Sequence, residues 1–445
     1  MLREELVNAL AHDCVHFKGD RPCQPHLRDG ALCRCPAYAP RSAKILLIQL
    51  SSPLTVIRSS ALVHRLKNDD PNSHITYLTS WPELLSKETD EPLTPDAAGI
   101  LRLQMDQFDE AYNLGIDRRS CATMNIIDAR QKRGCYLRQG DPAPLDGAAD
   151  EYLKVIVPHS RDTNQTGILQ RLFQMCSLEY RRELPRLFAP AIGFPQLGRQ
   201  GPLIGLNTSD DSESHAKSCW NHRHWLRLIE MLSQCGMTPL LLGNPGTDML
   251  NRLLASNSSA VYPGYITFGH TDFNGKSKLY YYDPKELAVL NNNEGDESLS
   301  SDDFIKGSAP LSIRDFMALL GSCDVITGVP GITTELAWSL GREVAILCSR
   351  PHNNIRDSLK AFAGSKVPDY FRSRHSIIEP LGVSNERACL NDILPDQVFQ
   401  AILERLQHGT ADKTSRSDVS PNRKFTPDSL SVERARISNT RRRPY

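Results

Sequence analysis

The sequence predicts an α/β protein in which two Rossmann-like domains stand in tandem and face each other across a cleft. Two apolar runs, at 44–50 and 203–206, have the composition of strands buried on both faces of a parallel sheet. A Gly-rich turn at 328–331 separates a further apolar strand from a helix, as at the strand ends where such sheets bind ligands. With 445 residues, 40% of them hydrophobic, the chain is long enough for two cores.

The first domain is expected to start after a Pro-rich boundary and to alternate helices with strands. Its first strand, at 44–50, ends at Ser51-Ser52-Pro53, where the backbone must turn. Apolar residues three and four apart in 168–176 predict an amphipathic helix near the end of this domain. Between them we expect a helix at 56–66, strands at 75–79 and 108–114, and a helix at 121–130.

The second domain is expected to follow a linker at 185–201, which is rich in Pro, Gly and Arg and lacks periodicity. Hydroxyl residues Thr333 and Thr334 followed by helix formers are typical of a helix N-terminus just after the Gly-rich turn. The other expected elements are strands at 203–208, 237–242, 324–327 and 344–347, and helices at 220–229, 313–320 and 396–406.

Composition divides the chain into five segments. These are a Cys-rich N-terminal segment at 1–42, a first domain at 43–184, the linker at 185–201, a second domain at 202–407 and a tail at 408–445. Residues 262–309 form an insertion in the second domain, whose acidic centre is expected to be a disordered loop. The tail is rich in Ser, Thr and Pro, with nine basic and four acidic residues, and is also expected to be disordered.

Four cysteines lie close together in the N-terminal segment: Cys14, Cys23, Cys33 and Cys35. Four thiols in a Pro- and Gly-rich stretch predict a structural zinc or iron site, because a metal supplies folding energy that so short a segment cannot obtain by burial. Only one residue separates Cys33 from Cys35, however, where structural sites usually have two. A reduced cap without metal therefore fits as well, and no cofactor for catalysis is expected.

The totals exclude several classes of protein. The chain has 52 basic and 52 acidic residues, so no net field draws it to nucleic acid. No run reaches the roughly 18 apolar residues of a membrane span, and no basic stretch followed by an apolar core opens the chain. Neither apolar first strand is followed by Gly-x-Gly-x-x-Gly, which disfavours a dinucleotide-dependent oxidoreductase. These features predict a cytoplasmic protein.

The order of these motifs, from about 44 to 406, resembles glycosyltransferase family 9, the ADP-heptose:lipopolysaccharide heptosyltransferases and their relatives. The resemblance is carried by the strand–turn–helix at 324–338, the two tryptophans Trp220 and Trp225 after a strand, and the Leu-Leu-Gly turn ending at Gly243. It implies a GT-B fold and an inverting transfer of a sugar, expected to be heptose, from a nucleotide-diphosphate sugar to a saccharide or protein acceptor. It also allows peripheral membrane association through that acceptor.

The resemblance places the donor in the second domain. Its diphosphate is expected between the turn after the strand at 203–208, the family's phosphate-binding lysine and the start of the helix at 333. A solvated lysine beside a core tryptophan fits Lys217 as well. The expected donor contacts in this sequence are Thr208, Ser209, Lys217, Gly243, Gly331, Thr333, Thr334 and Glu335.

The chain departs from the family at polar positions of the site. Thr55 stands where the family has the aspartate that serves as general base, and a threonine hydroxyl cannot act as a base near neutral pH. Pro330 and Glu335 stand where the family has an aspartate and a histidine. The catalytic base is therefore unknown, with Asp162 and Asp109 as the available candidates. The alternative is a homologue that has lost catalysis and serves as a binding or scaffolding protein.

Overall fold

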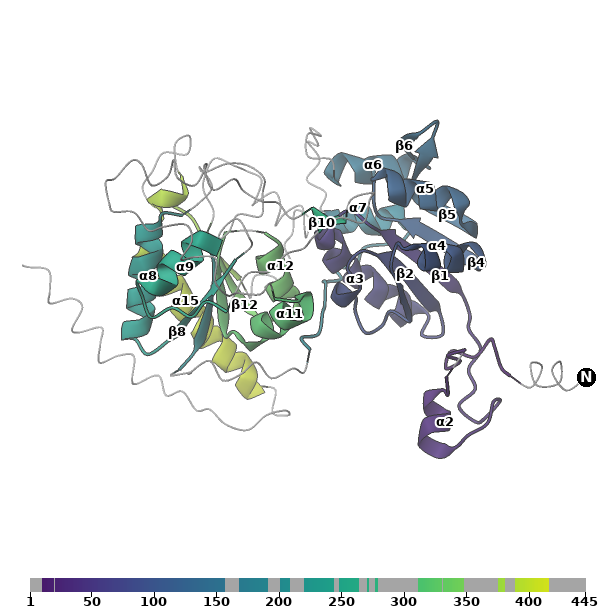
Figure 1. The fold of residues 1–445 in the computed structure, drawn as a ribbon, viewed down its shortest axis with the longest axis horizontal. Helices are drawn as coiled ribbons and strands as arrows, with labels where there is room; N and C mark the ends of the chain where they lie inside the picture. Colours follow the sequence, from purple (N-terminus) through teal and green to yellow (C-terminus); the bar gives the residue numbers. More distant parts are fainter. Residues whose placement is uncertain are drawn as a thin grey trace, which may run out of the picture.

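In the computed structural model, the described residues form two α/β domains, each built on its own sheet (Figure 1). The sequence-based prediction of two Rossmann-like domains is thereby confirmed. The described residues are 10–19, 21–156, 168–190, 201–208, 220–243, 248–263, 270–271, 277–278, 311–329, 331–347, 375–380 and 389–415.

The N-terminal domain has a six-stranded sheet in the order β3-β2-β1-β4-β5-β6. Its strands are β1 (Lys44–Gln49), β2 (His74–Thr79), β3 (Glu91–Leu93), β4 (Gln107–Asn113), β5 (Asp128–Arg138) and β6 (Asp141–Pro144). All neighbours are parallel except β5 and β6. The helices are α3 (Pro53–Asp69), α4 (Ala97–Gln104), α5 (Arg118–Ile126), α6 (Gly147–Ile156) and α7 (Ile168–Met175), with a 3-10 turn, η1, at Pro82–Leu84.

The C-terminal domain has a five-stranded, wholly parallel sheet in the order β13-β12-β11-β7-β8. Its strands are β7 (Leu203–Asn207), β8 (Thr238–Leu242), β11 (Val325–Gly328), β12 (Glu343–Leu347) and β13 (His375–Ile378). The helices are α8 (His222–Gln234), α9 (Asp248–Ser256), α11 (Ile313–Ser322), α12 (Ile332–Ser339) and α15 (Pro395–Ser415), with a 3-10 turn, η3, at Leu390–Asp392. A short antiparallel pair, β9 (His270–Thr271) and β10 (Ser277–Lys278), lies in the insertion.

Both sheets have a switch point, where the order of the strands in the sequence reverses. In the N-terminal sheet the chain passes from β1 to β2 on one side, and β4 then pairs with the other side of β1. In the C-terminal sheet β8 and β11 flank β7 in the same way. Ligands of open α/β sheets bind at the carboxyl ends of strands at such switch points.

The two domains meet through α3 and α12, which pack against each other (Figure 1). One apolar cluster runs across this contact, from Ile57 and Leu62 of α3 to Leu336 of α12 and Phe316 of α11. The expected linker begins within it, because Leu187 is buried and its N–H donates to the carbonyl of Ser339 (2.9 Å). The contact thus brings the carboxyl ends of β1 and β11 toward the same seam.

Two sequence-based expectations about elements are wrong. The helix expected at 121–130 ends at Ile126, and residues 128–138 form β5, because this segment completes the sheet beside β4. The tail expected to be disordered from 408 begins as helix, since α15 continues to Ser415, and the rest of the tail lies outside the described residues. The helix expected at 56–66 is confirmed and is longer than expected, spanning Pro53–Asp69.

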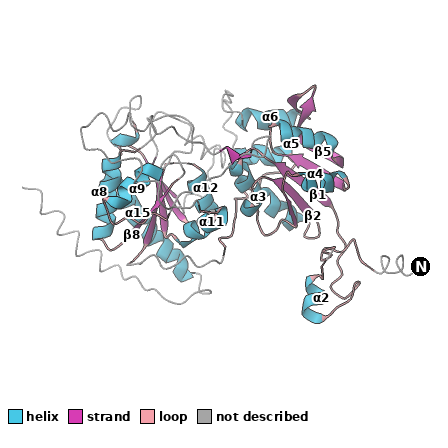
Figure 2. Cartoon of the chain, viewed as in Figure 1, coloured by secondary structure: helices cyan, strands magenta, loops and turns pink. Residues whose placement is uncertain are grey.

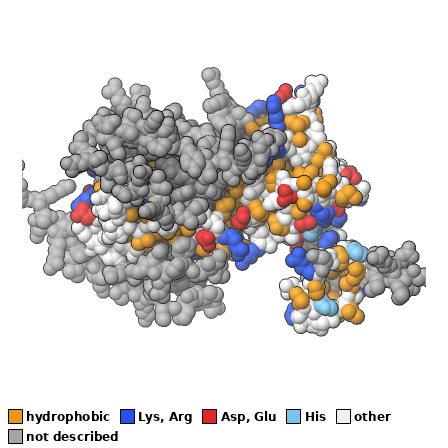
Figure 3. Space-filling model, in the orientation of Figure 1, with side chains coloured by type: hydrophobic (Ala, Val, Ile, Leu, Met, Phe, Trp, Pro, Cys, Tyr) orange, Lys and Arg blue, Asp and Glu red, His pale blue; other side chains and the backbone are white. Residues whose placement is uncertain are grey.

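The N-terminal segment forms a small unit set apart from the two sheets in the view of Figure 2. It contains one short helix, α2 (Gln24–Asp29), and an antiparallel bridge between Cys14 and Pro40 joins its two ends. On the face shown in Figure 3, acidic, basic and apolar side chains are interspersed over the N-terminal domain, in keeping with the equal numbers of acids and bases. Among the described residues, no helix is long and apolar enough to cross a membrane.

Candidate functional site

Two buried amides shape the switch point of the N-terminal sheet. Gln49, the last residue of β1, donates from Nε2 to the Leu114 carbonyl (2.9 Å) and accepts at Oε1 from the backbone N–H of Ser51 (3.0 Å). Asn113, the last residue of β4, accepts the N–H of Gly115 at Oδ1 (3.0 Å). These bonds hold the turns after β1 and β4 against each other and fix the floor of the site.

Helix α3 starts at this floor. Ser52 is its N-cap, and its Oγ accepts the N–H of Thr55 (3.2 Å), while its carbonyl accepts the N–H of Val56 (3.2 Å). Pro53 occupies the first turn, where its missing N–H costs nothing. The helix start is therefore largely satisfied from within.

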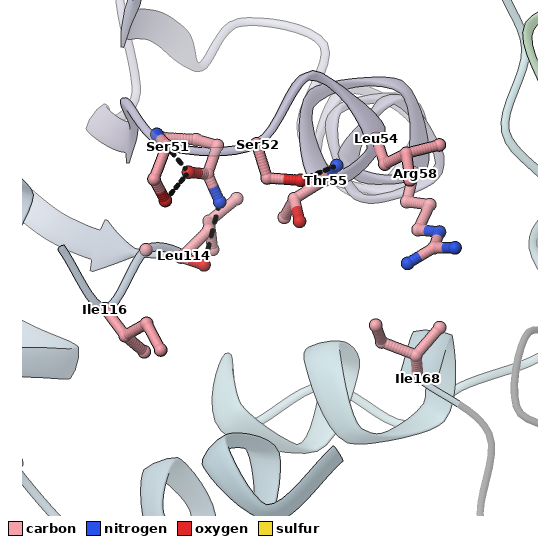
Figure 4. Close-up of a pocket in the computed structure, with 10 residues that line it drawn as sticks. Ser51, Ser52, Leu54, Thr55, Arg58, Leu114, Ile116 and Ile168 are labelled. Atoms are coloured by element: carbon pink, nitrogen blue, oxygen red, sulfur yellow. Dashed lines mark hydrogen bonds between the residues drawn. The ribbon is translucent and has the colours of Figure 1, made fainter. Parts of the chain in front are cut away.

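A cavity of about 270 Å³ opens between this helix start, the turn after β4 and the start of α7 (Figure 4). Hydroxyls and apolar side chains face it from opposite sides, and Arg58 reaches it from one helical turn beyond Thr55. Its lining residues are Gln49, Ser51, Ser52, Leu54, Thr55, Arg58, Leu114, Gly115, Ile116 and Ile168. None of these described lining residues carries a carboxylate or an imidazole.

Arg58 joins the two domains at the edge of the cavity. Its Nε donates to Glu335 Oε2 (2.9 Å) and its Nη2 to Oε1 (2.5 Å), a two-pronged ion pair between α3 and α12. The side chains of Arg58 and Glu335 are 16% and 23% exposed. Burial lowers the pKa of Arg58, but Glu335 raises it by more, so that the guanidinium stays charged. Glu335, expected to contact the donor, instead accepts from Arg58 with both oxygens.

The switch point of the C-terminal sheet is a close approach of two strand ends. Gly328 ends β11 with φ +149°, and a Cβ on it would lie 2.1 Å from the carbonyl oxygen of Asn207 in β7. The side-chain amide of Asn207 in turn donates to the carbonyl of Val329 (3.1 Å). Only glycine allows this approach, which positions the turn leading into α12.

The start of α12 is held by its own threonine. Thr334 Oγ1 accepts the N–H of Gly331 (3.0 Å) and donates to the Gly331 carbonyl (2.9 Å). Thr333 and Thr334 are both 3% exposed, so their side chains pack inward. The N-terminal end of a helix carries a partial positive charge, so the polarity of this end of α12 favours an anion.

Thr208 is also turned inward. It follows β7 at 2% exposure, and its hydroxyl donates to Oδ1 of the fully buried Asn251 in α9 (2.7 Å). Its N–H donates to the carbonyl of Leu242 (3.3 Å), beside the buried Gly243. The hydroxyl expected to meet the donor therefore fixes the turn between β7 and β8.

Solved structures of similar fold match this arrangement of two domains. A family 9 glycosyltransferase from Veillonella parvula matches at 12% identity and a TM-score of 0.55, covering 82% of this chain and 97% of that one. The ADP-heptose lps heptosyltransferase II of E. coli matches at 15% identity and a TM-score of 0.52, covering 82% and 99%. The chain has the GT-B fold of family 9 glycosyltransferases. Neither a model of a known protein family nor a curated protein sequence matches it.

Within this fold, Thr55 lies at the cavity, whereas Asp109, a candidate base, lies elsewhere. Thr55 lines the cavity at the start of α3. Asp109 lies beside the opposite end of β1, where it accepts the N–H of Lys44 (2.9 Å) and pairs with Arg130 (3.0 Å), so it cannot be the base. The other candidate base, Asp162, and two expected donor contacts, Ser209 and Lys217, lie outside the described residues.

The four N-terminal cysteines are all described, and the structure does not gather them into a ligand set. Cys14 is buried, Cys23 and Cys35 are half-buried, and Cys33 is exposed. Over the described part of the chain, no three His, Cys, Asp or Glu side chains come together as metal ligands. These positions do not fit a bound zinc or iron ion, and the metal stays a prediction.

Arg58 is the main residue of the site that the sequence did not single out. Its only signal is a lone arginine among apolar and small residues, three positions after Thr55. Gln49 and Asn113 had a weaker signal, as amides ending two neighbouring apolar strands.

Proposed function

We propose that the chain is a glycosyltransferase that transfers a sugar from a nucleotide-diphosphate donor to a hydroxyl acceptor. The observation that supports it best is the meeting of two switch points at one seam. A hydroxyl-lined cavity lies on the N-terminal side, and the α12 start lies on the C-terminal side. Acceptor and donor sites on facing domains are what a group transfer between two sugars requires.

The donor class in this proposal is an ADP-heptose-like nucleotide sugar. One of the matched structures is named an ADP-heptose lps heptosyltransferase. The acceptor is a saccharide of lipopolysaccharide type or a protein, and the displacement is inverting. The proposal includes the cytoplasmic location that the sequence predicts, and peripheral membrane association through the acceptor. Cell fractionation tests both.

The chemistry that the site can supply is stabilisation of the departing diphosphate. Backbone N–H groups at the α12 start, together with Lys217, would offset the charge that develops on the leaving group. No described residue of the cavity can act as the general base that deprotonates the acceptor hydroxyl, because Thr55 occupies the place of the base.

The test is ADP release from ADP-heptose by the purified protein, with and without candidate acceptors, beside Lys217→Ala. We expect ADP-heptose to bind to the wild-type protein and to be turned over, and the variant to lose most of its affinity. Absence of both binding and turnover would refute the proposal.

A second candidate is a binding protein that keeps the nucleotide-sugar site but not the transfer. The described cavity lining, which lacks a carboxylate and an imidazole, favours it. Thr55→Asp separates the two, with Thr55→Asn as its uncharged control. If the wild-type protein binds ADP-heptose without turnover and only the aspartate variant releases ADP, the binding protein is the correct assignment.

A further inference from the structure

The cavity of the N-terminal domain offers two kinds of surface to a ligand. On one side, the hydroxyls of Ser51, Ser52 and Thr55 face it from the start of α3. On the other side, apolar side chains face it, among them Ile116 and Ile168 (Figure 4). A pyranose ring has the same two characters, with hydroxyls at its rim and C–H groups on its faces.

The size of the cavity suits one ring. Its volume is about 270 Å³, slightly below the roughly 300–1,000 Å³ of sites for drug-sized ligands. A disaccharide would have to extend beyond it.

The charge of the cavity is balanced. Among the described lining residues Arg58 is the one charged side chain, and Glu335 already accepts from its Nε and Nη2. An anionic group entering here must either break this ion pair or lie beside a carboxylate in a partly buried site, and both are costly.

The start of α3 does not change this balance. Ser52 already accepts the N–H groups of Thr55 and Val56, and Pro53 has none to offer. The helix end is thus poorly suited to an anion, although an uncapped helix start would attract one.

We infer that this cavity binds an uncharged sugar ring, and that Arg58 and Glu335 together select against acidic sugars. The binding of the ring does not depend on the proposed function. Its description as the acceptor does rest on glycosyl transfer.

The experiment uses matched probes on the full chain, namely neutral methyl hexopyranosides and the corresponding methyl uronates, titrated by ligand-observed NMR. For the wild-type protein we expect at least one hexoside to bind, and its uronate to bind about tenfold more weakly, equivalent to about 1.4 kcal/mol. In Glu335→Gln the guanidinium loses its counter-charge, so the uronate should gain about tenfold and bind about as tightly as the hexoside.

Two further variants keep the outcome interpretable. The double variant Arg58→Met/Glu335→Gln removes both charges and should restore the preference for the hexoside. Thr55→Val should weaken binding of the hexoside without changing the order of preference. Glu230→Gln, on the outer surface of α8, serves as the control and should bind as the wild-type protein does.

Three results would overturn the inference: no hexoside binds, the uronate binds to the wild-type protein at least as tightly, or Glu335→Gln leaves the preference unchanged. A separate titration with ADP-heptose distinguishes this failure from failure of the proposed function, because the donor is expected at the other domain.

Discussion

Replacing Glu335 by glutamine should destabilise the protein markedly, because it breaks the ion pair that joins the two domains. Glu335 accepts two hydrogen bonds from Arg58, at 2.9 and 2.5 Å, with the side chains 16% and 23% exposed. Breaking a fully buried pair costs about 3–5 kcal/mol, and hydrogen bonds to charged groups contribute about 1.5–3 kcal/mol. Because the pair is partly exposed, we expect Glu335→Gln to lower the free energy of unfolding by about 2–3 kcal/mol.

The measurement is urea unfolding, followed by tryptophan fluorescence and far-ultraviolet circular dichroism, on a double-mutant cycle. The cycle comprises Arg58→Met, Glu335→Gln and the double variant, and we expect a coupling of about 1.5–2.5 kcal/mol. Arg227 and Glu230 of α8 form the matched control, since their Nη1–Oε2 distance is 2.6 Å but each side chain is 54% exposed. Breaking that surface pair should cost about 0–1 kcal/mol. A coupling energy between Arg58 and Glu335 no larger than that between Arg227 and Glu230 would refute the reasoning.

Three other predictions concern the strand crossing, acid sensitivity and metal content. Gly328→Ala should cost about 1–3 kcal/mol or prevent folding, because the added Cβ meets the Asn207 carbonyl at 2.1 Å, whereas Gly147→Ala, with nothing within 4 Å, should be near neutral in thermal unfolding. Burial raises the pKa of Asp106, but Lys44 and Arg102 lower it by more. This carboxylate therefore stabilises the fold at pH values above its unfolded pKa, and the contribution is lost as the pH falls through the lower folded pKa. Asp106→Asn should flatten the acid limb of a stability–pH profile. If the N-terminal segment holds a metal, elemental analysis should find about one zinc or iron per chain, and replacement of its four cysteines should remove it; equal metal content with and without them would exclude the site.

The fold could be predicted because the residues of its central strands identify them without reference to the rest of the chain. The run Lys44–Gln49 is apolar and buried along nearly its whole length, and Leu203–Asn207 is buried throughout, so composition alone identifies each as the centre of a parallel sheet. The turn at Gly328 is likewise marked by its residue type, because a close approach of backbones needs glycine.

Strand β5 could not be predicted from its composition. The segment Asp128–Arg138 is rich in charged residues, yet it pairs with β4 and returns to β6 through Gln139 and Gly140, both with positive φ. This two-residue turn is the hairpin type that matches the twist of antiparallel strands. Tertiary pairing overrides local preference here.

The ion pair at the site could not be predicted either. Arg58 and Glu335 are 277 residues apart, and nothing in either local sequence specifies the other. The inward-turned hydroxyls of Thr208 and Thr334 show a similar limit, since residue type suggests a ligand contact while the bonding partner decides where the hydroxyl points.

The most direct test of the central claim is calorimetric titration of the full chain with ADP-heptose and with ADP. The two-domain account predicts that both bind at one site per chain, and that Lys217→Ala weakens both while leaving the unfolding midpoint unchanged. If neither ligand binds to the folded wild-type protein, the second domain is not a nucleotide-sugar site and the account is contradicted.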